Sequence, residues 1–201
     1  MNSRLTIALL SALSVLTPAA TAGDPAAGQQ KSTICAACHA PDGNSVNPTW
    51  PKLAGQHPEY TEKQLRDFRD KQRDNAQMSP MASPLSDPDI ADLAAYFAAQ
   101  AGAGGVAHPE HLELGQKLYR AGNPRTGLPS CMACHGPGGA GNDAAGYPAL
   151  AGQHAEYTLL QLRAFKSEER ANDKDSVMRT IAGKMTIKEI EAVSDYIQGL
   201  H

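Results

Sequence analysis

All four cysteines of the chain fall in two copies of one short motif, in which two cysteines three positions apart are followed directly by a histidine. Two thiols at this spacing on one helical turn can both form thioethers with vinyl groups on one edge of a porphyrin. The imidazole that follows then points at the iron. This C-x-x-C-H pattern is the attachment signal of c-type haem. The sequence predicts two covalent haem c groups, attached through Cys35, Cys38, Cys131 and Cys134, with His39 and His135 as axial iron ligands.

Other uses of paired cysteines fit this spacing less well. A zinc ribbon needs its two C-x-x-C pairs roughly 15 to 20 residues apart, whereas Cys38 and Cys131 are separated by most of a domain. Exported proteins often carry structural disulfides, but a C-x-x-C disulfide is usually a labile catalytic one. Nothing in this sequence resembles the βαβ unit of thioredoxin, so covalent haem is the favoured interpretation of both motifs.

The two halves of the chain repeat each other, with one cysteine motif in each. Residues 53–61, Leu-Ala-Gly-Gln-His-Pro-Glu-Tyr-Thr, match residues 150–158, Leu-Ala-Gly-Gln-His-Ala-Glu-Tyr-Thr. Solenoid repeats have periods of about 20 to 50 residues, and this repeat is far longer. It therefore indicates two duplicated domains with one haem each.

Each half ends in a predicted helix. Ser86 and Asp89, and likewise Thr186 and Glu189, fit a capping box, in which a hydroxyl caps the helix and a carboxylate follows three residues later. Apolar residues then recur with helical spacing. Strand patterns are weak, and residues 41–51 and 137–148 are rich in Gly, Pro and Asn, as expected of loops that wrap a haem. The sequence predicts an all-α fold. The predicted apolar faces consist of Ile90, Leu93, Ala94 and Phe97 in the first half and of Ile190, Val193 and Ile197 in the second.

Residues 1–22 have the features of a secretory signal peptide. Arg4 gives a positive start, residues 5–16 are mostly apolar, and Ala20-Thr21-Ala22 fits a signal-peptidase site. The apolar run is shorter than the roughly 20 residues that span a bilayer as a helix. We therefore expect a soluble mature protein in the periplasm, with an uncleaved N-terminal anchor as the alternative.

Net charge gives little information about partners. The whole chain carries a formal charge of −3, and it has no basic run of the kind that binds nucleic acid. A role in nucleic-acid binding is therefore excluded from the expected functions.

An electron-carrying haem needs a second axial ligand, and methionine is the natural candidate, because a thioether favours reduced iron and raises the potential. The terminal helices repeat at an offset of 100 residues, which pairs Met78 with Met178. Met81 has no counterpart methionine, and Met185 pairs with a leucine. We expect Met78 and Met178 to be the ligands, with Met81 as the main competitor and with core packing as the expected role of Met81, Met132 and Met185.

A bis-histidine site is the other possibility. His57 and His154 occupy matching positions in the repeated loop, and histidine ligation lowers the potential relative to methionine. His108, His111 and His201 lack any paired context and are expected to be surface residues.

The chain resembles the cytochrome c4 family, whose members are diheme class I cytochromes of bacterial respiratory chains. The resemblance rests on the paired C-x-x-C-H motifs, the two Leu-Ala-Gly-Gln loops, Leu85-Ser86-Asp87 before the first terminal helix, and the closing residues 196–201. It implies two tandem all-α cytochrome c domains, each wrapped around one haem and related by a pseudo-twofold axis. We expect a signal peptide at 1–22, domains at 23–101 and 111–201, and a linker at 102–110.

The resemblance also implies details of each haem site. His/Met ligation is expected in both domains, and the carbonyls of Pro51 and Pro148 are expected to accept hydrogen bonds from His39 and His135. Family pattern suggests that Gly28 and Gly115 let the first helix of each domain approach the last one, near Tyr96 and Tyr196. An insertion at 123–129 precedes the second haem motif, and its role is not readable from sequence.

The predicted function is electron transport without catalysis. The resemblance implies a quinol-oxidising complex as donor and a terminal oxidase as acceptor in a respiratory chain; peripheral association with a membrane is left open. One alternative is the electron-transfer subunit of a dehydrogenase, and a less favoured one is a diheme peroxidase, which needs an open ligand position at one iron.

Overall fold

The computed structural model describes residues 23–201, and the predicted signal peptide lies outside this range. Within residues 23–201 the chain is helical, without a β-strand, and the predicted all-α fold is confirmed. The first five helices are α1 (Pro25–Lys31), α2 (Ala36–His39), α3 (Pro58–Arg69), α4 (Met78–Ala82) and α5 (Asp87–Ala98). The next five are α6 (Pro109–Ala121), α7 (Met132–His135), α8 (Ala155–Lys166), α9 (Val177–Gly183) and α10 (Ile187–Gln198), with short 3-10 turns η1 (Asp143–Ala145) and η2 (Lys174–Ser176).

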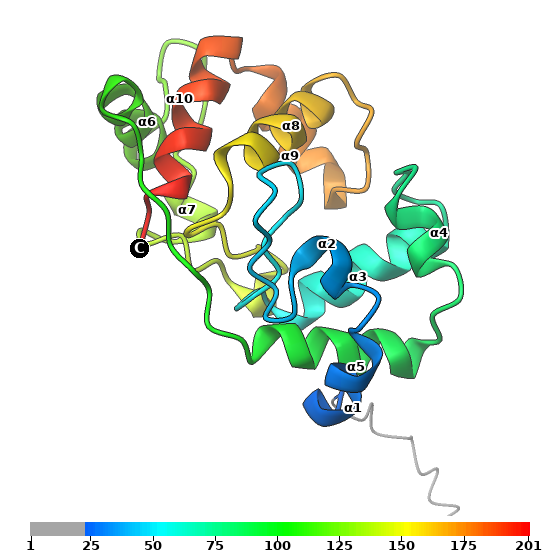
Figure 1. Cartoon of the computed structure of the whole chain (residues 1–201). Helices are drawn as coiled ribbons and strands as arrows, with labels where there is room; N and C mark the ends of the chain where they lie inside the picture. The colour runs from blue at the N-terminus through cyan, green and yellow to red at the C-terminus, as the bar shows by residue number, and fades with distance from the viewer. Residues whose placement is uncertain (1–22) are drawn as a thin grey trace, which may run out of the picture.

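The ten helices form two domains with the same arrangement (Figure 1). In the first domain α1 and α3 pack on α5, and α4 packs on α3. In the second domain α6 and α8 pack on α10, and α9 packs on α8. The sequence repeat is therefore a repeat of structure.

Both terminal helices begin with the predicted capping boxes. The Ser86 hydroxyl accepts from the Asp89 backbone N–H at 3.3 Å, and the Asp89 carboxylate accepts from the Ser86 N–H at 3.0 Å. Thr186 and Glu189 make the same exchange, at 3.2 and 2.7 Å. These bonds satisfy backbone donors that a helix start otherwise leaves unpaired.

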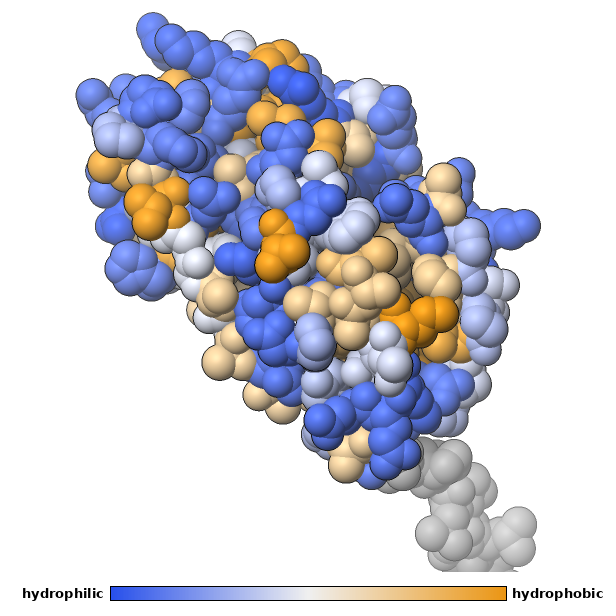
Figure 2. Space-filling model, viewed as in Figure 1, coloured by the Kyte–Doolittle hydropathy of each residue, from blue (hydrophilic) through white to orange (hydrophobic). Residues whose placement is uncertain are grey.

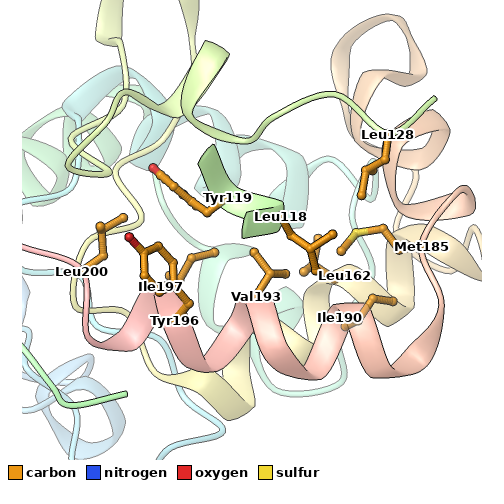
Figure 3. Close-up of a cluster of buried hydrophobic side chains, with 10 residues drawn as sticks. All are labelled: Leu118, Tyr119, Leu128, Leu162, Met185, Ile190, Val193, Tyr196, Ile197 and Leu200. Carbon is orange, nitrogen blue, oxygen red and sulfur yellow. The ribbon is translucent and has the colours of Figure 1, made fainter. Parts of the chain in front are cut away.

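The terminal helices bury the predicted apolar faces. In the second domain, Ile190, Val193 and Ile197 project from α10 into a core that includes Leu118 and Tyr119 (Figure 3). The first domain has a smaller core of Leu93, Tyr96 and Phe97. Half-buried apolar residues border that smaller core, namely Cys35, Leu53, Leu65 and Leu85.

The insertion at 123–129 forms a tight turn that closes on itself. Asn123 and Leu128 exchange backbone hydrogen bonds at 2.9 and 3.0 Å, and the Leu128 side chain is buried in the core of the second domain. The Asn123 amide donates to the Glu189 carboxylate at 2.8 Å. The insertion therefore braces the start of α10.

The visible face of the molecule is mostly hydrophilic, with apolar residues gathered over part of the first domain (Figure 2). None of the helices between residues 23 and 201 combines the length and the apolar content that crossing a membrane requires.

Candidate haem sites

Each C-x-x-C-H motif folds into one helical turn. In α2 the His39 backbone N–H donates to the Cys35 carbonyl at 2.9 Å, and in α7 His135 donates to Cys131 at 3.0 Å. Ala40 and Gly136 end the two helices with φ angles of 64° and 78°. With ψ angles of 160° and 159°, the backbone leaves the helical path at these residues, directly after each histidine. The turn therefore keeps both thiols and the imidazole together, as attachment to one porphyrin edge requires.

The two histidines predicted to be axial ligands are buried, and backbone carbonyls orient them, as expected. Nδ1 of His39 lies 2.9 Å from the Pro51 carbonyl oxygen, and Nδ1 of His135 lies 3.0 Å from that of Pro148. Because a carbonyl oxygen only accepts, Nδ1 is the donor and the lone pair of the neutral ring lies on Nε2. Nε2 is the atom that a metal takes when the other ring nitrogen donates to a carbonyl.

Burial also shifts the pKa values of the histidines and of one cysteine in these motifs. It lowers the pKa of His39 and of His135, although the hydrogen bonds to Pro51 and Pro148 oppose it, and the neutral imidazole is the form that binds metal. Burial raises the pKa of the Cys131 thiol to about 11. A redox C-x-x-C pair needs a thiol pKa below its ordinary value, so this shift argues against a thioredoxin-like use of the second motif.

The candidate methionines occupy different environments. Met78 opens α4 and Met178 lies in the first turn of α9, and both side chains are half-buried. Met81 is 43% exposed, whereas Met185 is 3% exposed within the second core. Core packing is thus confirmed for Met185 and is wrong for Met81; Met132 is half-buried and packs against the second core.

The paired histidines of the repeated loop lie at the contact between domains. Nε2 of His57 bonds the Ala140 carbonyl oxygen of the second domain at 2.8 Å. Nε2 of His154 bonds the Ser45 carbonyl oxygen of the first domain at 2.8 Å. These bonds occupy the nitrogens that would face an iron, which argues against the bis-histidine alternative.

Known proteins share this arrangement. A family model described as cytochrome c matches residues 25–100 and 112–201. "Cytochrome c4" from Thiocapsa roseopersicina is 54% identical over 180 residues, which make up 89% of this chain and 93% of that protein. The chain belongs to the cytochrome c4 family. A crystal structure of reduced recombinant cytochrome c4 from Pseudomonas stutzeri matches with a TM-score of 0.87 and 48% identity, over 90% of this chain and 100% of that one.

A more distant relative has a more specific description. The "Thiosulfate dehydrogenase electron acceptor" from Thiomonas intermedia (strain K12) is 36% identical over 206 residues, which make up 98% of this chain and 90% of that protein. Like the cytochrome c4 relatives, it matches both domains of this chain.

Membership of the cytochrome c4 family establishes a diheme electron carrier in which each domain binds one haem c covalently. The residues present fit that group. Each domain offers two free thiols and a buried neutral imidazole on one turn, next to apolar side chains of its core. The predicted haem cofactors and the two cytochrome c domains are confirmed.

Sequence reasoning missed the role of the repeated loop in this cytochrome c4 family member. The side-chain amide of Gln56 bonds both the N–H and the carbonyl oxygen of Ala149, at 2.9 and 3.0 Å. Gln153 does the same to Lys52, at 2.9 and 2.9 Å. The contacts are reciprocal, which places the domains in an approximate twofold relation. The close match of residues 53–61 to 150–158 was the signal for this interface.

A second reciprocal network flanks the first. Arg73 donates to Gln161 of the second domain at 2.7 Å, and Arg170 donates to Gln64 of the first domain at 3.1 Å. Each guanidinium also stacks on a phenylalanine of its own domain, at 4.6 and 4.4 Å from the ring centroids. Hydrogen bonds to a charged group contribute more than neutral ones. The two haem domains are therefore joined by a polar interface with defined geometry.

Proposed function

We propose that this carrier ligates each haem iron with one histidine and one methionine, pairing His39 with Met78 and His135 with Met178. The paired placement of the two methionines carries this assignment. Each lies in the first turn of the helix that precedes a terminal helix, and each is half-buried. Met81 and Met185 share no such placement, because one is exposed and the other is core.

The haem iron supplies one-electron redox chemistry, and the chain sets its conditions. Pro51 and Pro148 orient the imidazoles, and a methionine thioether as the second ligand would raise the potential of each iron. Covalent bonds from the four cysteines of the C-x-x-C-H motifs hold the two haems in place. Ligands that stay bound in both oxidation states leave little to rearrange during transfer.

The route of the electrons is part of the same proposal. The carrier works in the periplasm, takes electrons from a quinol-oxidising complex and passes them to a terminal oxidase. Residues 1–22 act as the export signal, and residues 102–110 link domains at 23–101 and 111–201. Ile34, next to the first attachment cysteine, is 62% exposed and supplies apolar surface for brief contact with redox partners.

An optical spectrum of the mature protein tests the ligation. Two haem c groups per chain are expected in a pyridine haemochrome assay, and both ferric irons are expected to show the weak near-infrared band of methionine ligation. A high-spin ferric signal that shifts when peroxide is added would contradict the proposal and favour a diheme peroxidase.

A dehydrogenase partner is the second candidate function. It is favoured by the 36% identity to a protein described as the electron acceptor of thiosulfate dehydrogenase. Stopped-flow mixing of the ferric protein with such a dehydrogenase and its substrate distinguishes the two routes. Reduction faster than by a quinol-oxidising complex would favour this candidate.

A further inference from the structure

One peptide group joins the axial histidine of each domain to a glutamine of the other. In the peptide between Pro51 and Lys52, the carbonyl oxygen accepts from Nδ1 of His39 at 2.9 Å. The N–H of the same peptide donates to Oε1 of Gln153 at 2.9 Å. Gln153 is 101 positions from Lys52 and belongs to the second domain.

The second domain repeats this arrangement with the roles exchanged. The carbonyl oxygen of the peptide between Pro148 and Ala149 accepts from His135 at 3.0 Å, and its N–H donates to Oε1 of Gln56 at 2.9 Å. The duplication thus produces two chains of hydrogen bonds, each of which crosses the domain interface once.

Each glutamine side chain makes three hydrogen bonds. Oε1 of Gln153 also accepts from the backbone N–H of His154 at 3.0 Å, and Nε2 donates to the Lys52 carbonyl at 2.9 Å. Gln56 makes the matching bonds, to His57 at 3.0 Å and to Ala149 at 3.0 Å. Both side chains are half-buried, where hydrogen bonds polarise one another more strongly than they do in water.

We propose that Gln153 and Gln56 are positioning residues that tune the reduction potential of the haem in the opposite domain, through the Pro51–Lys52 and Pro148–Ala149 peptides. The inference rests on the proposed axial roles of His39 and His135. It adds a function to the interface, since docking of the domains then sets the potentials as well as the distance between the haems.

The direction of the effect follows from electron donation. A peptide N–H that donates to glutamine makes its own carbonyl oxygen a stronger acceptor. The carbonyl then draws the Nδ1 proton more strongly, and the imidazole becomes a better donor at Nε2. Stronger donation stabilises ferric iron, so loss of the glutamine raises the potential of the haem in the opposite domain.

The Gln153→Leu variant of the complete diheme protein tests this direction. At a fixed ambient potential, we expect the ferrous-to-ferric ratio of the first-domain haem to rise by about threefold, since one polarising bond is lost. At 59 mV per tenfold for one electron, this is about 28 mV. The second-domain haem should not change. Potentiometric titration followed by NMR, with haem methyl signals assigned to each domain, resolves the two haems.

A second readout follows the hydrogen bond itself. In the ferrous, diamagnetic protein with ¹⁵N-labelled histidine, the Nδ1 proton of His39 should move upfield in Gln153→Leu, because its bond to Pro51 weakens. The His135 proton should stay in place. Gln56→Leu should produce the reverse pattern, and Gln153→Ala provides a second variant if leucine disturbs folding.

Gln161→Leu is the matched control. Gln161 also lies at the interface, where it accepts from Arg73 at 2.7 Å and from Arg170 at 2.9 Å. It makes no bond to either of the two peptide groups that accept from His39 and His135. General loosening of the interface admits water, which stabilises the charged ferric haem and lowers the potential. The inference would be overturned if the potential of the first-domain haem fell in Gln153→Leu. It would also be overturned if both haems shifted equally or if neither shifted.

The outcome is separable from the proposed ligation. If the near-infrared bands of both irons persist in Gln153→Leu while the potential stays constant, the ligation stands and the tuning fails. If the wild-type protein lacks those bands, methionine ligation fails, and the NMR shift of the His39 proton still decides whether Gln153 acts on that histidine.

Discussion

Gly28 of α1 lies so close to α5 that a β-carbon added to it would stand 2.7 Å from Cβ of Tyr96 and 2.0 Å from the Asp92 carbonyl oxygen. Gly115 and Tyr196 repeat this contact in the second domain, with corresponding distances of 2.6 Å to Tyr196 and 2.3 Å to the Ala192 carbonyl. The expected approach of each first helix to each last one is confirmed. Only glycine allows these backbones to meet.

Gly28→Ala and Gly115→Ala should therefore force the helices apart. We expect each variant to lower the free energy of unfolding by about 1–3 kcal/mol, the usual cost of overpacking. Chemical denaturation followed by helical circular dichroism measures the change. Gly183→Ala is the matched control, since a β-carbon there meets no atom within 4 Å; a loss of stability as large in the control would contradict this explanation.

Removal of one of the two methionines proposed as axial ligands should affect one haem. In Met178→Ala we expect the near-infrared band to fall to about half and the potential of the second-domain haem to drop, because the thioether that favours ferrous iron is gone. Cyanide should then bind one haem per chain. Met81→Ala should leave both the band and cyanide binding unchanged, and a half-lost band in that variant would move the assignment from Met78 to Met81.

Met185 should contribute stability without ligation. Its side chain is 3% exposed and packs with Leu118 and Leu162 in the second core (Figure 3). Met185→Ala should cost about 2–5 kcal/mol of unfolding free energy through the cavity it leaves. Met185→Leu, which conserves volume, should cost less than about 1.5 kcal/mol. Loss of the near-infrared band in either variant would show that Met185 ligates iron instead.

His108 should make stability depend on pH near neutrality. It is a surface residue, as expected, and its Nδ1 lies 2.6 Å from the carboxylate of Asp195, which is buried on α10. This hydrogen bond raises the pKa of His108 above its ordinary value of 6.5. The stabilisation should be fully present below pH 6.5 and disappear as pH rises through the raised pKa.

NMR titration of the His108 ring, together with denaturation at several pH values, checks this dependence. Asp195→Asn removes the charged partner, so the His108 pKa should fall towards 6.5 and the pH dependence in this range should flatten. Because the histidine is exposed, salt should weaken the effect in the wild-type protein. A His108 pKa that is the same in both proteins would contradict the assignment.

Most of the features that could be predicted from the sequence depend on residues that are close together in the chain. Cys35 to His39 form a site within one helical turn, so their spacing was sufficient to predict haem attachment. Ser86 and Asp89 cap a helix across three residues, and the apolar spacing after them follows from 3.6 residues per turn. Pairing Met78 with Met178 needed only the offset between two copies of the same domain.

The sequence by itself determined the all-α class, the duplication, the haem cofactors and the histidines of the C-x-x-C-H motifs, because all of these depend on local spacing. Only the tertiary structure decided that the repeated Leu-Ala-Gly-Gln-His loops face each other across the interface. The bonds from Gln153 to Lys52 and from His154 to Ser45 join residues 101 and 109 positions apart. Such contacts depend on how the surfaces of the two folded domains pack together, and no periodicity in the sequence specifies that packing.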